Sequence, residues 1–99
     1  MATYMLFIRE GEVVDQDALD QFRAAGGIRT ELALKMNVKP LVVQGEMETF
    51  EGAAPDGMVL LEFPDKQSTL TWYLSEEVQE RVKLLLKSAP HRCIMVQGV

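Results

Sequence analysis

An apolar run followed at once by a helical pattern, over residues 57–75, constrains the fold more than any other part of this sequence. Residues 58–63 contain a single polar side chain, Glu62. A run this uniformly apolar is typical of a strand whose two faces are both covered. The run ends at Pro64 and Asp65, after which apolar residues recur at helical spacing. We therefore predict a buried strand that leads directly into a helix.

Three more apolar segments predict the other strands, at residues 4–8, 41–50 and 92–97. Helical spacing fills two intervals between them, from residue 15 to 37 and from residue 65 to 90. The resulting order, βαββαβ, predicts an α+β, ferredoxin-like antiparallel sheet with two helices on one face. Because a chain of 99 residues has the size of one domain, we expect a single domain over residues 1–99.

Both helical regions carry signs of a break. Gly26 and Gly27 interrupt the first region, and each glycine costs about 1 kcal/mol in a helix interior. Ser75 is a favoured type of N-cap residue and marks a new start inside the second region. Asn37 fits the left-handed position that ends a helix. We therefore expect each region to contain two helical pieces.

Composition excludes several classes of function. The net charge is −5, with 15 acidic and 10 basic side chains, which disfavours nucleic acid and anionic lipid as partners. One cysteine, Cys93, and one histidine, His91, leave no internal disulfide and no Cys/His zinc site. The sequence contains no P-loop, dinucleotide or metal signature, no apolar run near the ~20 residues that span a bilayer and no secretory signal. We expect a cytoplasmic protein without metal or cofactor.

The apolar strands predict a second subunit. Two helices cover one face of the sheet, and the other face holds about half of the apolar strand residues. Each such residue left in water forgoes roughly 1.5–3 kcal/mol, and five or six together rival the whole ~5–15 kcal/mol stability of a domain. We expect a homodimer formed through the sheet face. The alternatives are a monomer whose first helical region covers that face, or a monomer with an apolar surface.

The second half of the chain resembles a known family. The residues that carry the resemblance are Glu51-Gly52, Pro55–Gly57, Leu61–Pro64, Trp72-Tyr73, Ser75, Arg92 and Val96–Val99. They resemble the domain-of-unknown-function 1330 family of the dimeric α+β barrel superfamily. The resemblance implies a ferredoxin-like subunit and a barrel made by two facing sheets. It implies no activity, because the superfamily includes cofactor-free monooxygenases, haem-degrading enzymes, lactone isomerases and stress-response proteins.

Three residues are candidates for catalysis. Arg9 ends a strand and would hold a carboxylate or enolate if its guanidinium turned inward; a strand-end arginine in water or in an ion pair is the simpler interpretation. Glu62 interrupts an apolar strand, where a carboxylate can act as a base or serve as the counter-ion of Arg9 or Arg92. His91 is of the type that titrates near neutral pH, although its place before the last strand favours exposure.

Three aromatic residues are candidates for ligand binding, together with Arg9 and Glu62. Tyr73 shares the predicted inward face of its helix with Leu70 and Leu74, with its hydroxyl at the rim. Trp72 points elsewhere and covers either a cavity or the junction of helix and sheet. Tyr4 has the same ambiguity, and packing in the core is an equal alternative for all three.

Two functions fit these patterns. The first is a dimer that binds a small organic molecule in a cavity beside the sheet and performs cofactor-free chemistry on it. The second is a non-catalytic structural or partner-binding module, in which the polar candidates only satisfy one another. A cavity of several hundred Å³ that contains two or more of the polar candidates favours the first function, and a solidly packed interior favours the second.

Overall fold

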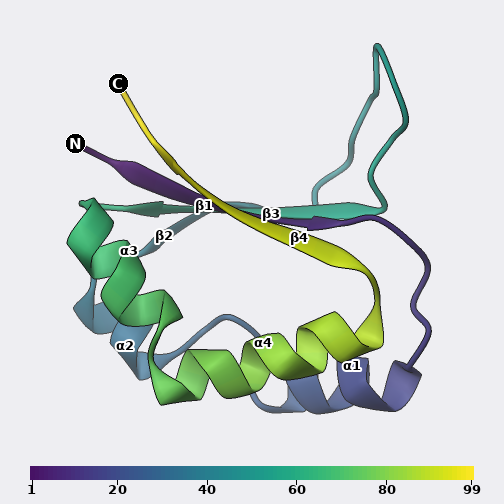
Figure 1. Cartoon of the computed structure of the whole chain (residues 1–99), viewed down its shortest axis with the longest axis horizontal. Helices are drawn as coiled ribbons and strands as arrows, with labels where there is room; N and C mark the ends of the chain where they lie inside the picture. The colour runs from purple at the N-terminus through teal and green to yellow at the C-terminus, as the bar shows by residue number, and fades with distance from the viewer.

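The computed structural model describes all residues, Met1–Val99, and places every helix on one face of a four-stranded antiparallel sheet (Figure 1). The elements are β1 (Thr3–Arg9), α1 (Gln16–Ala24), α2 (Glu31–Lys35), β2 (Lys39–Val43), β3 (Gly57–Phe63), α3 (Lys66–Tyr73), α4 (Glu76–Ser88) and β4 (His91–Gln97). The strand order is β2-β3-β1-β4. The predicted ferredoxin-like α+β fold is confirmed. None of the helices is both long and apolar enough to cross a membrane.

The alternation of side chains along each strand builds the core on the helix side of the sheet. Met5 and Phe7 of β1 and Leu61 and Phe63 of β3 are almost fully buried there. Trp72 of α3 packs against two of these rings, with its ring centroid 5.3 Å from that of Phe63 and 6.4 Å from that of Phe7. Aromatic pairs in tilted or edge-to-face geometry stabilise a core beyond simple burial.

Each helical region contains two helices, as the breaks in the sequence predict, and a side-chain cap starts each of them. Asp15, Thr30, Asp65 and Ser75 each accept a hydrogen bond from the backbone N–H three residues later, which satisfies a donor that the helix leaves free. The turn between α1 and α2 runs through Gly26 and Gly27, with φ of 101° and 62°, where a side chain would strain the backbone.

The second strand is shorter than predicted. It ends at Val43 rather than at residue 50, and residues 44–56, which we call the arm, project from the sheet without a partner strand (Figure 1). Gln44 adopts a left-handed φ of 53°, which turns the chain away from the sheet. Because β3 begins only at Gly57, the alternating residues of the arm have no ladder to join.

The inward face of α3 also differs from the prediction. Thr69 and Trp72, three residues apart, form the buried face, whereas Leu74 is 66% exposed. Leu70 and Tyr73 of the predicted inward face are only half-buried, and Leu74 is the C-cap, past the last helical residue. In α4, Val78, Val82 and Leu85 are buried, and Leu86 is exposed.

The face of the sheet that lies away from the helices is apolar and uncovered. One row across it joins Val42, Leu60, Leu6 and Ile94 as successive cross-strand partners. Ile94 is 40% exposed, and the other three are half-buried. The arm and both chain ends extend to this side of the sheet (Figure 1). Since α1 and α2 lie on the opposite side, the alternative in which the first helical region covers this face is wrong.

Candidate functional site

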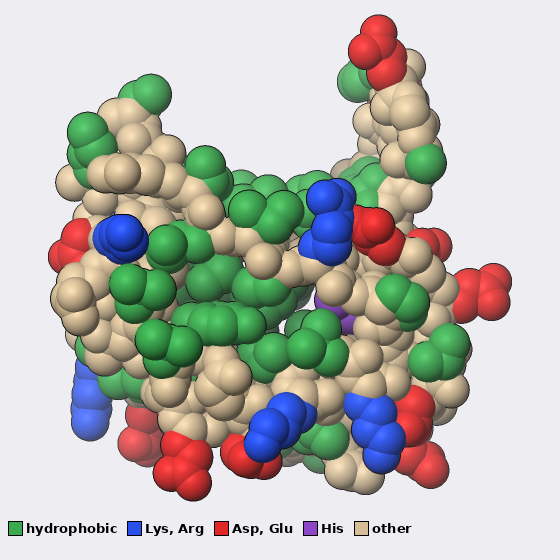
Figure 2. Space-filling model, viewed as in Figure 1, with side chains coloured by type: hydrophobic (Ala, Val, Ile, Leu, Met, Phe, Trp, Pro, Cys, Tyr) green, Lys and Arg blue, Asp and Glu red, His purple; other side chains and the backbone are tan.

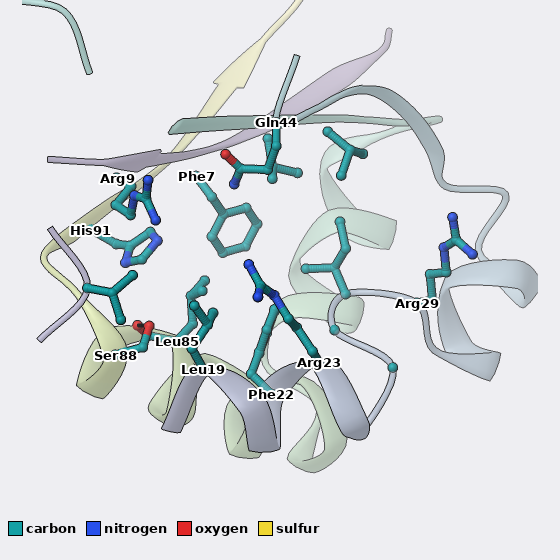
Figure 3. Close-up of a pocket in the computed structure, with 16 residues that line it drawn as sticks. Phe7, Arg9, Leu19, Phe22, Arg23, Arg29, Gln44, Leu85, Ser88 and His91 are labelled. Carbon is teal, nitrogen blue, oxygen red and sulfur yellow. Dashed lines mark hydrogen bonds between the residues drawn. The ribbon is translucent and has the colours of Figure 1, made fainter. Parts of the chain in front are cut away.

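A cavity of about 400 Å³ lies between the sheet and helices α1 and α4 (Figure 3). Eight of the 16 residues that line it are hydrophobic. Phe7 and Val59 contribute from the strands, and Phe22 and Leu85 contribute from the helices. The volume lies within the range of small-molecule sites, which are mostly apolar with a few polar groups. Figure 2 shows the molecular surface hollowed on this side.

A polar row crosses the sheet at one end of the cavity. Gly57, Arg9 and His91 are cross-strand neighbours on β3, β1 and β4. Gln44 lies over Gly57, because a side chain at that glycine would put its Cβ 2.2 Å from Oε1 of Gln44. Figure 3 shows the side chains of Gln44, Arg9 and His91 directed toward the same space as Phe7. The row therefore offers an amide, a guanidinium and an imidazole side by side.

Arg9 is held by the base of the arm rather than by an acidic side chain. Its Nη2 donates to the backbone oxygen of Asp56 at 2.9 Å, and the backbone N–H of Asp56 donates to the carbonyl of Arg9 at 2.8 Å. The Nε atom is buried and has no hydrogen-bond partner. A buried donor without a partner is costly, so an acceptor that reached this atom would be favoured.

His91 is oriented by the chain that leads from α4 into β4. Its Nδ1 lies 2.8 Å from the carbonyl oxygen of Ala89. Because a carbonyl oxygen only accepts, Nδ1 carries the hydrogen, and the neutral ring keeps Nε2 as a hydrogen-bond acceptor. The backbone N–H of Glu10 donates to the carbonyl of Pro90 at 2.9 Å, which fixes this turn against the end of β1. The imidazole is thus set up to accept a proton at Nε2.

The charges around the cavity are all positive. None of the lining residues is an aspartate or a glutamate, although acidic residues outnumber basic ones in the chain. Arg23 of α1 points toward the interior, whereas Arg29 points away from it (Figure 3). Glu10, the acidic residue next to Arg9, pairs with Arg92 instead. The cavity therefore concentrates positive charge in an acidic protein.

Glu62 and Tyr4 lie outside this cavity, on the opposite face of the sheet. They are cross-strand partners on β3 and β1, and Lys39 of β2 is the other neighbour of Glu62. Strand alternation puts Arg9 on the helix side, so the expected pairing of Glu62 with Arg9 does not form. Arg92 pairs with Glu10, which excludes the second expected partner as well.

Trp72 belongs to the core and does not line the cavity. It is completely buried, and its Nε1–H donates to Oγ1 of Thr30 at 3.3 Å. Thr30 also caps α2, so a single hydroxyl joins the start of this helix to the core. Trp72 therefore packs in the core, and the sequence had left core packing open as the alternative to ligand contact.

Tyr73 lies beside Cys93, away from the cavity. Burial raises the pKa of the Tyr73 hydroxyl, and the neighbouring Cys93 raises it further. Burial likewise raises the pKa of the Cys93 thiol, to about 11. Both groups therefore stay protonated at neutral pH, where neither is a base or a nucleophile.

Four polar residues of the cavity were not among the candidates from the sequence: Arg23, Arg29, Gln44 and Ser88. Gln44 lay inside the predicted second strand, and only its left-handed φ brings its side chain over Gly57. Arg23 sits on the last turn of α1, and its direction depends on how α1 packs on α4. The available signal was the break at Gly26 and Gly27, which line the same cavity.

A second hollow between α2 and β2 lacks such a cluster of polar groups. It is lined mainly by apolar residues, among them Ala33, Val38 and Leu61, and its one charged side chain is Arg29. No group of three or more His, Cys, Asp or Glu residues is arranged to hold a metal ion. Of these two hollows, the cavity beside α1 and α4 is the one in which polar side chains converge.

Comparisons with known proteins agree with the fold. A dimeric ferredoxin-like protein of unknown function from Jannaschia sp. CCS1 matches with a TM-score of 0.69 and 17% identity, over 99% of this chain and 100% of that chain. A dimeric protein of unknown function with a ferredoxin-like fold from Bacteroides fragilis matches with a TM-score of 0.58 and 12% identity, over 98% and 96%. An antibiotic biosynthesis monooxygenase matches with a TM-score of 0.50 and 13% identity, over 100% and 99%.

Residues 3–99 match the family described as Domain of unknown function (DUF1330). No curated protein matches the sequence. The identities to the solved structures are low, so these structures support the fold alone. The family match spans nearly the whole chain, including the strands that carry Arg9 and His91. The chain therefore belongs to the DUF1330 family.

Proposed function

We propose that this protein binds a small organic molecule in the cavity between the sheet and helices α1 and α4. The observation that carries the proposal is the convergence of Arg9, His91 and Gln44 at one end of a cavity of about 400 Å³ whose other walls are largely apolar. Arg9 and His91 were candidates from the sequence, and a shared cavity was the condition that favoured binding over a purely structural role.

The two charged or titratable groups suit cofactor-free acid–base chemistry. Arg9 supplies a charged donor for an oxygen anion, and Nε2 of His91 supplies an acceptor for a proton. Removal of a proton from the bound molecule by His91 leaves the electron pair on an oxygen that the guanidinium stabilises. The fold is shared with an antibiotic biosynthesis monooxygenase, which is a precedent for small-molecule chemistry on such a scaffold.

The working form in this proposal is a homodimer through the open sheet face. Two structural neighbours are described as dimeric, and the row from Val42 to Ile94 is apolar and uncovered. Phe50, 87% exposed on the arm, gains cover if the arm reaches over a second copy. A cytoplasmic setting fits the single free thiol, Cys93, because such thiols persist in reducing compartments.

A structural or partner-binding module is the second candidate function. The observation in its favour is the same open apolar face, which explains a stable dimer without any ligand. In this case the residues of the polar row would lie together only because their strands end side by side, and they would bind no ligand. The two candidates differ in whether the cavity binds anything.

A melting-temperature screen of small organic molecules separates the candidates. A ligand of the cavity raises the melting temperature, because it binds the folded state only. The variant Val59→Phe fills the cavity from β3 and should abolish the shift, at a cost of about 1–3 kcal/mol for overpacking. Val14→Phe is the matched control, because Val14 is 76% exposed and does not line the cavity.

We expect at least one compound that stabilises the wild type and Val14→Phe but not Val59→Phe. Compounds that stabilise all three proteins equally bind elsewhere. A broad screen in which no compound depends on Val59 would leave the structural module as the better description.

A further inference from the structure

We propose that the cavity selects organic carboxylates with a flat apolar body, with the carboxylate at Arg9 and the body beside Phe7 and Phe22. This inference rests on the proposed function, and it adds the charge and shape of the ligand. It follows from three features of the site: the sign of its charges, the donors that remain free, and the position of its apolar walls.

The sign of the charges favours an anion. The guanidinium groups of Arg9 and Arg23 point into the cavity, and no acidic side chain lines it (Figure 3). A cationic ligand would therefore meet like charge without a counter-ion, which is costly in a partly enclosed site. A guanidinium presents paired N–H groups in a plane, which match the two oxygens of a carboxylate.

The free donors favour a carboxylate held at Arg9. Arg9 uses Nη2 on the carbonyl of Asp56, and its buried Nε remains without a partner. Other donors near the row are engaged: Ser88 Oγ donates to the carbonyl of Leu85 at 2.6 Å, and His91 Nδ1 binds the carbonyl of Ala89. The amide of Gln44 beside Arg9 supplies a further donor to an oxygen of the ligand.

The helix ends near the cavity argue against a phosphate. Gly26 and Gly27 follow the C-terminal end of α1, and Ser88 ends α4; all three residues line the cavity. Phosphate sites commonly use the free N–H groups of a helix N-terminus. The C-terminal ends carry partial negative charge and supply no such donors, so the cavity lacks the backbone N–H groups that phosphate sites commonly use.

The apolar walls favour a flat ring. Phe7 and Val59 lie one step inward from the polar row on β1 and β3, and Phe22 and Leu85 face them from the helices (Figure 3). Phe7 is held from the other side by Trp72, in an edge-to-face contact with centroids 6.4 Å apart. A ring attached one or two carbons from a carboxylate spans from this apolar region to Arg9.

Three probes of equal shape and different charge test the inference. Phenylacetate, phenylacetamide and phenethylamine are titrated into the wild-type protein by calorimetry. Hydrogen bonds to charged groups contribute about 1.5–3 kcal/mol, so phenylacetate should bind at least about tenfold more tightly than the neutral amide. The amine should bind most weakly.

Two variants test whether Arg9 is the source of the preference for phenylacetate over phenylacetamide. Arg9→Gln should reduce the affinity for phenylacetate to that for phenylacetamide while changing amide binding little. Arg92→Gln is the matched control, because this arginine pairs with Glu10 and does not line the cavity; the preference should survive it. If Arg9→Gln does not fold, the ranking of the three probes on the wild type decides the question.

The outcomes separate this inference from the proposed function. Equal binding of acid and amide, or tighter binding of the amine, overturns the inference and still leaves a cavity that binds small molecules. A preference for phenylacetate that persists in Arg9→Gln overturns the assigned position of the carboxylate. Failure of all three probes to bind at millimolar concentration also overturns the inference, and the screen with Val59→Phe then decides separately whether other ligands bind.

Discussion

Thr30 shows how a single side chain connects local structure with the core. Its hydroxyl accepts the N–H of Ala33 at 2.9 Å and caps α2, and it also accepts the indole N–H of the fully buried Trp72. Helix α2 follows the turn at Gly26 and Gly27, and both of these glycines line the cavity. The position of this cavity wall therefore depends in part on one hydroxyl.

Replacing Thr30 by alanine should destabilise the protein by about 2–4 kcal/mol, from a lost N-cap of about 1 kcal/mol and a buried indole donor left unpaired at about 1–3 kcal/mol. Thr30→Ser keeps the hydroxyl and should lose much less. Urea unfolding followed by the fluorescence of Trp72, the sole tryptophan, measures both variants. Equal losses for alanine and serine would show that the hydroxyl is not the source of the stability.

Cys93 gives a prediction for alkaline pH. Burial raises the pKa of its thiol from the ordinary 9.0 to about 11, so the folded state retains a proton that the unfolded chain releases. Its contribution to stability is fully present below pH 9.0 and is lost as pH rises through about 11. Under reducing conditions, the wild type should therefore lose more unfolding free energy than Cys93→Ala between pH 8 and 10. Parallel losses in the two proteins would contradict the assignment.

At the scale of elements, features that depend on neighbouring residues, such as helix caps, were predictable from the sequence. The lengths of paired strands were not. The cap at Ser75 and the break at Gly26–Gly27 depend on local rules, and the structure contains both. The end of β2 depends on where β3 begins, which alternation along one segment does not reveal. The predicted buried face of α3 was wrong because Thr69 and Trp72 face the core in place of Leu70 and Tyr73, and Leu74 lies past the end of the helix.

The base of the arm links these elements to the cavity, and Gly57 tests this link. Gly57→Ala places a Cβ 2.2 Å from Oε1 of Gln44. Because this atom ends a flexible side chain, Gln44 should swing away from the polar row and the fold should survive. We expect weaker binding of phenylacetate, by up to about tenfold for one lost hydrogen bond, with little change in melting temperature.

Gly45→Ala is the matched control on the arm. The added Cβ would meet Cγ1 of Val42 at 3.7 Å, an ordinary contact, so binding should be unchanged. Unaltered affinity in Gly57→Ala would show that Gln44 does not contribute to the site.

At the scale of the whole molecule, the two faces of the sheet have separate roles in this account. The helix side contains the cavity, and the open side provides the surface for a second copy. The sequence predicted both the surplus of apolar strand residues and the presence of Arg9 and His91 at strand ends. It left Glu62 and Tyr4 as candidates because the pairing register, which puts them together on the open face, comes from contacts between distant segments.

A charge on the open face should separate the subunits. Ile94→Lys puts an ammonium in the apolar row that contains Leu6, and burying an unpaired charge in an interface is strongly unfavourable. By size-exclusion chromatography with light scattering, we expect this variant to be a monomer and the wild type to be a dimer. Leu74→Lys is the control, because Leu74 is exposed on the helix side. A wild type that is monomeric at micromolar concentration would contradict the dimer.

The account depends most on the claim that the ligand site lies between the sheet and helices α1 and α4. An NMR titration of the ¹⁵N-labelled protein with phenylacetate tests this claim directly, residue by residue. We predict that the largest amide shifts occur at Arg9, Gln44 and His91. Shifts concentrated at Leu6 and Leu60 on the open face, or spread evenly over the chain, would contradict it.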